Sequence, residues 1–398
     1  MKKILNLIGR SDTLFDTDIN NFKVDIDLLI KRSKFLVIGA AGSIGKSVIF
    51  EIFKRNPLAL HAVDISENNL VELVRSLRSS LGYIHGDFRT FAIDSSSSEF
   101  KCFVSNETVN YDYVFNLSAL KHVRSESDPY TLMRMIRVNI FNTMDILDLI
   151  KPHTNLKKYF CVSTDKAANP VNLMGASKLV MELFLMRASL DVNISSARFA
   201  NVAFSDGSLL HGFNQRYLNN EPITAPVDIK RYFITPEESG QLCLLSALFG
   251  ENRDIFFPKI ENGLDLIKLS DIAQRFIAEK GFEPFICDSE EEARAKAKEL
   301  IPSKKWPCYF FKSDTTGEKD FEEFFTQKET IDMDKFKDVG IIKKEPNFNS
   351  EKLNMFSSGI NHLISHNQWN KEDIVKLFNN ILDNFYHKET GKYLDQKM

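Results

Sequence analysis

Cysteine is scarce in this 398-residue sequence: five are present, widely spaced, and no two form a C-x-x-C pair. That scarcity argues against a disulfide framework and a zinc site, and it is typical of thiols kept reduced in the cytosol. Long hydrophobic runs are also missing, since no stretch reaches the roughly 20 apolar residues that a membrane helix needs. The apolar stretch within residues 1–10 is too short for the central region of a signal peptide. We therefore expect a cytoplasmic protein without membrane insertion.

An excess of charge of one sign is absent as well, because 51 Lys and Arg residues are balanced by 54 Asp and Glu residues. Without a basic footprint, binding to nucleic acid is not expected. The histidines show no metal-ligand spacing, so we expect no metal. A hydrophobic content of 43% excludes disordered and fibrous chains. The length exceeds the size at which one core usually stops growing, which predicts two lobes.

From residue 34 onward, short apolar runs alternate with amphipathic segments of helix length. This alternation is typical of a parallel sheet with helices on both faces. The apolar runs predict strands at 35–38, 60–63, 90–93, 113–116, 159–163 and 194–199. Helical spacing of apolar residues predicts helices at 43–55, 67–81, 128–150 and 175–190. A later helix is expected after Thr235, because Thr-Pro-Glu-Glu has the pattern of a capping box with proline in the first turn.

Other segments lie outside this alternation. Residues 283–312 contain an acidic run followed by Lys- and Ala-rich helix formers, which favours a solvated surface helix. The tail from Asn370 to Phe385 places its apolar residues on one face of a helix. The sequence leaves open whether that face covers its own domain or a second subunit.

The clearest motif is Gly39-Ala40-Ala41-Gly42-Ser43-Ile44-Gly45, which leads from the first expected strand into a helix. Glycines let the backbone turn tightly and approach a pyrophosphate, which then binds at the positive end of the helix. Asp64 ends the second expected strand, 19 residues after Gly45, where a carboxylate can bind the adenine ribose. No basic residue directly follows Asp64, so we expect NAD rather than NADP. Asp94, after the third strand, would face the adenine.

A second group of polar residues surrounds the end of the fifth expected strand. Thr164, Asp165 and Lys166 close that strand, and Met174 and Lys178 lie four residues apart near the start of the next helix. Open α/β sheets bind ligands at the carboxyl ends of their strands. A hydroxyl, an acid and two amines are therefore expected to converge near the nicotinamide.

Taken in order, these motifs resemble the extended short-chain dehydrogenase/reductases, and within them the bacterial UDP-N-acetylglucosamine 4,6-dehydratases of polysaccharide and nonulosonic acid biosynthesis. The resemblance covers most of residues 34–345. It rests on GAAGSIG at 39–45, NLSALKHV at 116–123, STDKAANPVN at 163–172, MGASK at 174–178, ARFANV at 197–202, KRYFIT at 230–235, IFFPKI at 255–260 and TGEKDFEEFF at 316–325.

The resemblance implies an α/β fold: a Rossmann-type doubly wound parallel sheet with a smaller C-terminal substrate-binding lobe. It divides the chain into an N-terminal extension (1–31), an NAD-binding domain (32–200, which also receives 229–258), a substrate-binding lobe (201–228 and 259–345) and a C-terminal helical extension (346–398). A homo-oligomer is expected, because helices flanking the sheet commonly pair between subunits in this family.

The implied reaction is a hydro-lyase cycle on UDP-N-acetylglucosamine: NAD-mediated oxidation at carbon 4, loss of water across carbons 5 and 6, and return of hydride to carbon 6. Asp165 would protonate the departing 6-hydroxyl and Lys166 would take the carbon 5 proton. We expect burial near Lys178 to lower the pKa of Lys166. Thr164 would bind the 4-hydroxyl and Lys178 the nicotinamide ribose. The expected dinucleotide contacts are Gly39, Ala41, Gly42, Ser43, Ile44, Gly45, Asp64, Asp94, Leu117, Ala119 and Lys178.

Met174 departs from most short-chain dehydrogenases, which have Tyr at this position, and a thioether cannot deliver a proton. Some 4,6-dehydratases carry Met there too, so the substitution concerns the proton route rather than the reaction. Because a single base explains it most simply, retention at carbon 5 is favoured over inversion. The expected substrate contacts are Lys121, His122, Met174, Asn201, Arg231 and Glu318.

Two of these contacts bear on the diphosphate. The guanidinium of Arg231 suits phosphate oxygens. Glu318 matches the Glu of a family R-P-G-E-K segment, whose Arg position is Thr315 here. One phosphate contact is therefore missing or supplied from elsewhere, with 283–312 as a candidate.

Two other functions are considered beside the dehydratase. A nucleotide-sugar 4-epimerase needs no acid and base for carbons 5 and 6, so Asp165 and Lys166 argue against it. A non-catalytic nucleotide sensor would fit the missing Tyr at position 174, but the retained Lys178 argues against it.

Overall fold

A nine-stranded sheet forms the centre of the computed structural model, which describes residues 2–106, 110–152, 155–260, 264–319, 321–383 and 385–393. Its order is β15-β16-β11-β6-β5-β4-β1-β2-β3. The strands from β3 to β11 are parallel, and β16 and β15 are added antiparallel at one edge. Their bounds are β1 Lys34–Ile38, β2 Ala59–Asp64, β3 Asp87–Ala92, β4 Tyr113–Asn116, β5 Lys158–Thr164, β6 Ile194–Phe199, β11 Ile255–Pro258, β15 Thr330–Asp332 and β16 Val339–Lys343.

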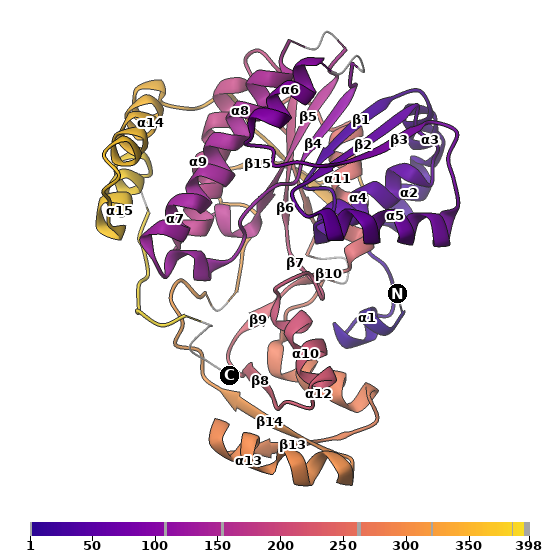
Figure 1. The fold of residues 1–398 in the computed structure, drawn as a ribbon, viewed down its shortest axis with the longest axis vertical. Coiled ribbons are helices and arrows are strands. Elements are labelled where there is room, and N and C mark those ends of the chain that lie inside the picture. Colours follow the sequence, from indigo (N-terminus) through magenta and orange to yellow (C-terminus); the bar gives the residue numbers. More distant parts are fainter. Residues whose placement is uncertain are drawn as a thin grey trace.

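Helices cover both faces of this sheet, which confirms the predicted doubly wound class (Figure 1). One side carries α4 (Ser43–Phe53), α5 (Glu67–Leu81) and α11 (Pro236–Phe249), and the other α6 (Ser98–Asn106), α7 (Pro129–Ile136), α8 (Asn142–Ile150) and α9 (Leu173–Ala188). Strand order reverses at β1, which lies between β2 and β4. Ligands bind such sheets in the crevice at the carboxyl ends of the strands beside that reversal.

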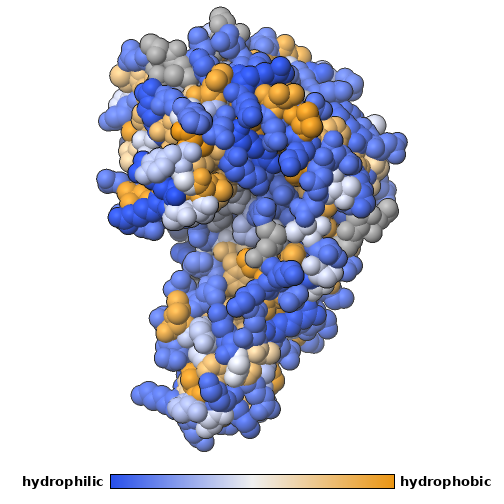
Figure 2. Space-filling model, turned by 90° about the vertical axis from the view of Figure 1, so that its right-hand side faces the viewer, coloured by the Kyte–Doolittle hydropathy of each residue, from blue (hydrophilic) through white to orange (hydrophobic). Residues whose placement is uncertain are grey.

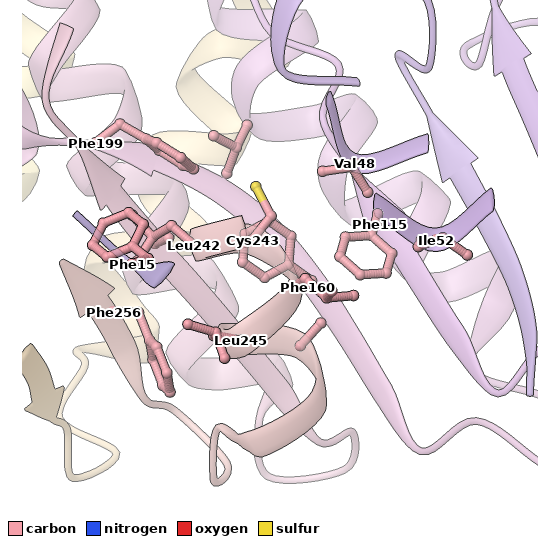
Figure 3. Close-up of a cluster of buried hydrophobic side chains, with 14 of the residues drawn as sticks. Phe15, Val48, Ile52, Phe115, Phe160, Phe199, Leu242, Cys243, Leu245 and Phe256 are labelled. Carbon is pink, nitrogen blue, oxygen red and sulfur yellow. The ribbon is translucent and has the colours of Figure 1, made fainter. Parts of the chain in front are cut away.

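Successive residues of β1 belong to opposite apolar clusters, as the two-residue period of a strand requires. Phe35 and Val37 pack in the cluster beneath α4 and α11, part of which Figure 3 shows, and Leu36 and Ile38 pack in the cluster beneath α7 to α9. All four are at most 1% exposed. A strand buried on both faces is nearly continuously apolar, which is why the sequence run was readable as a strand.

Two local predictions can be compared with the helices. Thr235 caps α11 in a complete capping box, as predicted: its side chain accepts from the Glu238 N–H, and the Glu238 carboxylate accepts from the Thr235 N–H. The helix predicted over 128–150 is interrupted by a π-helical turn at Arg137–Phe141 between α7 and α8. Such turns are frequent at functional sites, and this one presents Asn139, described below.

The smaller lobe lies below the main body and is narrower in the side view of Figure 2, where hydrophilic residues cover most of the visible face. The prediction of a lone surface helix over 283–312 was incomplete. The helix α13 (Glu290–Leu300) is present, but β13 (Glu283–Cys287) and β14 (Lys305–Phe311) flank it and pair in parallel. The lobe also contains α10 (Leu209–Leu218), α12 (Leu269–Glu279), β8 (Ile223–Pro226), which pairs with β14, and the short strands β7 (Asn201–Val202), β9 (Lys230–Arg231), β10 (Phe233–Ile234) and β12 (Ile267–Lys268).

The N-terminal extension contacts both parts of the molecule. Leu7 and Ile8, at and after the end of α1 (Lys2–Leu7), are buried in the apolar cluster of the lobe. Phe15 and Ile26 are fully buried in the main body. This segment also forms α2 (Asp16–Asn21) and α3 (Lys23–Lys31).

The C-terminal extension packs on its own chain. In α14 (Ser350–Ser365) and α15 (Lys371–Ile381), the apolar face that includes Ile374 and Phe378 is buried in the same cluster as α9. This answers the question left open by the sequence. The predicted domain boundaries stay a proposal. Among the described residues, no helix has the length and apolar character needed to span a membrane.

Candidate functional site

The glycine-rich loop between β1 and α4 needs its glycines for steric reasons. Gly39 has φ +75°, and a Cβ there would lie 2.8 Å from the Leu117 carbonyl carbon. A Cβ on Gly45 would lie 2.1 Å from the Gly39 oxygen. Gly42 is the N-cap of α4 and provides no side-chain cap. The first turn of α4 therefore packs closely against the backbone of the glycine-rich loop, and its N–H groups, which have no partner within the helix, are suited to binding an anion.

Asp64 fastens this loop to the end of β2. Its Oδ2 accepts from the Ala41 N–H at 2.9 Å, and its Oδ1 accepts from the Ser66 N–H at 2.9 Å. Each carboxylate oxygen has a second lone pair for a ribose hydroxyl. Asp94 is exposed and accepts from both the N–H and the hydroxyl of Ser96 at 2.8 Å, as a turn carboxylate does.

The π-helical turn holds the loop that follows β4. The Asn139 side chain accepts from the Leu120 N–H at 2.9 Å and donates to the Leu120 carbonyl at 3.0 Å. It also donates to Ser177 of α9 at 3.0 Å. Leu117 donates its N–H to the Ile38 carbonyl at 2.8 Å. The predicted contacts Leu117 and Ala119, both partly exposed, thus lie on a loop fixed beside the glycine-rich loop.

A residue that sequence reasoning missed, Asp206, reaches the start of α4. Ser43 Oγ donates to Asp206 Oδ2 at 3.0 Å and accepts from the Asp206 N–H at 2.8 Å. The same loop lies beside the predicted substrate contacts. A Cβ on Gly207 would lie 2.7 Å from His122 Nε2. Lys121 is exposed, but surrounding protein partly desolvates it and lowers its pKa, against the opposing charge of Asp206.

At the end of β5, Asp165 and Lys166 lie together with a third ionisable residue, Glu322. Lys166 Nζ lies 3.2 Å from Asp165 Oδ1 and 3.6 Å from Glu322 Oε1. The side chains of Asp165 and Glu322 are only 3% and 4% exposed. Thr164 Oγ1 donates to Asp165 Oδ1 at 2.8 Å. Glu322 was inside a recognised segment, but no spacing rule connects it to residue 166.

The expected lowering of the Lys166 pKa was wrong. Burial does act in that direction, but the charges of Asp165 and Glu322 outweigh it and raise the pKa of Lys166. Lys166 is therefore an ammonium in this arrangement. For Glu322, burial and the charge of Asp165 raise the pKa of the carboxyl above its usual range, despite the opposing charges of Lys166 and Arg231.

Lys178 and Met174 are both buried on α9. Lys178 Nζ donates to the Val162 carbonyl at 3.0 Å and lies 3.6 Å from Met181 Sδ. Burial lowers the pKa of Lys178. Met174 is 3% exposed, and its N–H donates to Glu126 Oε1 at 2.9 Å.

Arg231 and Glu318 form an ion pair at the boundary of the lobe. Arg231 also donates to the Lys319 carbonyl at 2.9 Å, and Thr315 Oγ1 donates to Glu318 at 3.0 Å. Thr315, where the family has Arg, is thus part of the support of Glu318. The Asn201 side chain donates to the carbonyl of Tyr232, the residue after Arg231, at 3.3 Å.

The C-terminal segment 385–393 returns to this region, which the sequence gave no reason to expect. His387 Nε2 lies 3.0 Å from Glu126 Oε2, on the carboxylate that binds the Met174 N–H. The Lys388 carbonyl accepts from the Gly317 N–H at 2.9 Å. The segment therefore links the start of α9 to the loop that carries Glu318. Within the described residues, no three His, Cys, Asp or Glu side chains are grouped as metal ligands would be.

The larger described cavity, about 1050 Å³, lies beside the Asp165 and Lys166 pair rather than on it. Its lining includes Asn169, Lys319 and Glu323 but neither member of the pair. The predicted dinucleotide and acid–base residues instead follow the carboxyl ends of β1, β4 and β5.

Comparisons with known proteins cover most of this region. A family model described as "Polysaccharide biosynthesis protein" matches residues 35–344. The chain is 28% identical to "Uncharacterized membrane protein MJ1061" of Methanocaldococcus jannaschii, over 80% of this chain and 88% of that protein. It is 27% identical to "UDP-N-acetylglucosamine 4,6-dehydratase (inverting)" of Campylobacter jejuni, over 62% of this chain and 71% of that protein. It spans 45% of the capsular polysaccharide biosynthesis protein CapD of Staphylococcus aureus, at 28% identity over 70% of this chain.

Sugar epimerases match at similar identity: 26% for UDP-glucose 4-epimerase of Rickettsia prowazekii, over 71% of this chain and 87% of that protein. Among solved structures, Pen from Bacillus thuringiensis has a TM-score of 0.64 at 23% identity, covering 79% of this chain and 88% of that one. WbmF of Bordetella bronchiseptica, solved with NAD+, has a TM-score of 0.52 at 15% identity, covering 72% and 89%. These likenesses show the fold, a Rossmann-type doubly wound α/β sheet with a smaller lobe.

Proposed function

Because the chain belongs to the polysaccharide biosynthesis protein family, whose relatives include nucleotide-sugar dehydratases and epimerases, we propose that it is an NAD-dependent UDP-N-acetylglucosamine 4,6-dehydratase. The observation that carries the proposal is the pair of Asp165 and Lys166, an acid and an amine 3.2 Å apart at the carboxyl end of β5. Elimination of water across carbons 5 and 6 needs a base that takes the proton from carbon 5 and an acid that protonates the hydroxyl on the neighbouring carbon 6. Epimerisation at carbon 4 does not.

Residues of this chain fit NAD. Gly39 and Gly45 let the backbone close on a dinucleotide, and Asp64 presents a carboxylate with no basic residue beside it to attract a 2′-phosphate. Bound there, NAD would take a hydride from carbon 4 and return it to carbon 6. Lys178 would bind the nicotinamide ribose, and Thr164 the 4-hydroxyl. The structure of WbmF with NAD+ and UDP is of the same fold, which supports a UDP-sugar.

In this proposal, Asp165 protonates the 6-hydroxyl as it departs, and Lys166 takes the proton from carbon 5. With Lys166 as the single base, the proton would return to the face of carbon 5 from which it came. We therefore keep retention at carbon 5 as the prediction, although the Campylobacter relative carries the word inverting in its name. Lys121, His122, Met174, Asn201, Arg231 and Glu318 would surround the sugar and diphosphate.

Incubating the purified protein with UDP-N-acetylglucosamine and recording the mass of the product tests this function. A dehydratase gives loss of one water, an epimerase gives no change in mass with a new diastereomer, and a sensor gives neither. In deuterated water, the product should gain one deuterium at carbon 5. A proton NMR spectrum then distinguishes UDP-2-acetamido-2,6-dideoxy-hexos-4-ulose of the D-xylo configuration (retention) from L-arabino (inversion).

Matched variants test whether Asp165 and Lys166 are responsible for the loss of water. Asp165→Asn and Lys166→Ala should abolish loss of water while NAD binding remains. Asp191→Asn removes a carboxylate that is 60% exposed and should leave the rate unchanged. Near-normal dehydration by both pair variants would contradict the assignment. The homo-oligomer and the cytoplasmic location stay predictions, which gel filtration and cell fractionation test.

A further inference from the structure

Glu322 is placed so that it shares the ammonium of Lys166 with Asp165. One oxygen of each carboxylate faces Lys166 Nζ, at 3.2 Å for Asp165 and 3.6 Å for Glu322. The other oxygens, Asp165 Oδ2 and Glu322 Oε2, are buried and have no hydrogen-bond partner among the described residues. Two carboxylates buried around one amine are costly to fold and are more typical of functional sites.

The ion pair between Arg198 of β6 and Glu182 of α9 holds the segment that carries Glu322. Arg198, which is 1% exposed, donates to both carboxylate oxygens of Glu182 and to the Phe324 carbonyl, two residues after Glu322. Glu182 also accepts from Ser163 Oγ at 2.6 Å, two residues before Asp165. The segment carrying Glu322 and the end of β5 are thus held by the same buried pair.

Other charges around the ammonium do not replace Glu322. Arg231 faces both Lys166 and Glu322, and Lys319 faces Glu322. The charge of Arg231 is already paired with the carboxylate of Glu318. The group of Asp165, Lys166 and Glu322 therefore has two acids for one amine.

We propose that Glu322 is a positioning residue of the dehydration, which acts through Lys166 by stabilising the ammonium that forms when Lys166 takes the carbon 5 proton. This inference rests on the proposed function. Before elimination, one proton moves from Lys166 Nζ to Asp165 Oδ1, which leaves a neutral amine and a carboxylic acid. The amine then takes the proton from carbon 5, and the electrons of that C–H bond form the second bond of a double bond between carbons 5 and 6. The bond from carbon 6 to oxygen breaks, the oxygen takes the Asp165 proton, and water leaves.

After this step Lys166 is again an ammonium between two carboxylates, as in the structure. Relative to the neutral amine that precedes proton abstraction, a charged Glu322 lowers the energy of this ammonium, so the rate of proton abstraction from carbon 5 should depend on the ionisation of Glu322. Because burial raises the pKa of Glu322, its carboxyl takes up a proton at a higher pH than an ordinary Glu, and the wild-type rate should fall with that protonation. In Glu322→Gln the stabilisation is absent at every pH.

The test is the ratio of wild-type to Glu322→Gln dehydration rates (kcat) across pH. We expect a ratio of roughly tenfold or more at neutral pH, where the lost charge acts at close range, that shrinks toward one as the pH falls and the wild-type carboxyl is protonated. Glu322→Asp should restore part of the neutral rate. Glu323→Gln, which changes the exposed neighbour, should match wild type at each pH. A ratio that stays constant with pH would indicate a purely structural role and overturn the proposal.

A second measurement needs no turnover. Carbon-13 NMR of protein labelled at glutamate carboxyls, with Glu322→Gln to assign the signal, follows the titration of Glu322 directly. Lys166→Met should raise the Glu322 pKa further, because the ammonium is gone. An unchanged titration would refute the coupling. Failure of the wild type to release water would instead refute the proposed function, so the two failures are distinguishable.

Discussion

Replacing Arg198 by Met should destabilise the protein strongly. The guanidinium is 2.7 Å from one oxygen of Glu182 and 3.0 Å from Glu329, and it binds the Phe324 carbonyl at 3.0 Å. The Glu182 and Glu329 side chains are 4% and 8% exposed. Met has a similar length but no charge. Glu182 would therefore be left buried without its cation, and Glu329 would keep Lys344 as its remaining ion-pair partner.

Removing one partner of a buried ion pair costs about 3 to 5 kcal/mol. With an unfolding entropy of about 2.1 cal/mol/K per residue, 398 residues give about 0.8 kcal/mol/K. The Tm should therefore fall by about 4 to 6 °C. Differential scanning calorimetry at neutral pH measures this shift. Arg294→Met, which breaks only surface pairs on α13, should change the Tm by about 1 °C or less. Equal small shifts in both variants would refute the reasoning.

The same pair predicts a pH dependence. Burial would raise the pKa of Glu329, but Arg198 and Lys344 outweigh it and lower the pKa from 4.5 to about 2. A folded-state pKa below the unfolded one adds stability that is complete above pH 4.5 and is lost as the pH falls toward 2. Arg198→Met should lose less stability in this window than wild type. An identical acid dependence of Tm would show that Glu329 does not depend on Arg198.

Three further predictions concern the dinucleotide and acid–base residues. Asp64→Asn keeps an acceptor for one loop N–H but removes the negative charge that disfavours a 2′-phosphate. The ratio of the NADP to the NAD dissociation constant, measured by calorimetry, should therefore fall about tenfold (about 1.4 kcal/mol). An unchanged ratio would show that Asp64 does not determine which cofactor binds. Gly45→Ala places a Cβ 2.1 Å from the Gly39 oxygen and should abolish NAD binding, whereas Gly212→Ala, whose Cβ would meet only the end of the Arg216 side chain at 3.3 Å, is the control for glycine replacement; NAD binding by Gly45→Ala would show that the loop can widen. Met174→Leu should keep most activity because the side chain only packs, whereas Lys178→Ala should lose both activity and NAD affinity; an inactive Met174→Leu enzyme would give the thioether a chemical role.

Local signals in the sequence were sufficient for most of the sheet and its helices. The helix predicted over 67–81 is α5 with the same bounds, because an N-cap Ser66 and a C-terminal Gly82 delimit a regular apolar stripe. The strands β13 and β14 were missed because each contains proline, and the pairing of β14 with β8 joins segments about 80 residues apart.

For the site, motifs predicted the loop at 39–45 and the Asp165 and Lys166 pair, but not their surroundings. Glu322 lies 156 positions after Lys166 in the sequence, and Asp206 lies 163 after Ser43. No local pattern encodes such distances. The direction of the Lys166 pKa was wrong partly for the same reason: the neighbouring Asp165 raises it most, and Glu322, which adds to this effect, comes from a distant segment.

The N-terminal extension has a consequence for how the protein is made. Asp18 accepts from the N–H groups of Lys337 and Asp338, the latter 320 positions later in the chain. At about 5 to 20 residues per second, a ribosome needs roughly 15 to 60 s to reach those partners. Throughout that time Phe15 and Ile26, which are fully buried in the finished protein, are without the later segments that pack against them. Newly synthesised chains should therefore depend on chaperones that shield these side chains until the segment with Lys337 and Asp338 has been made.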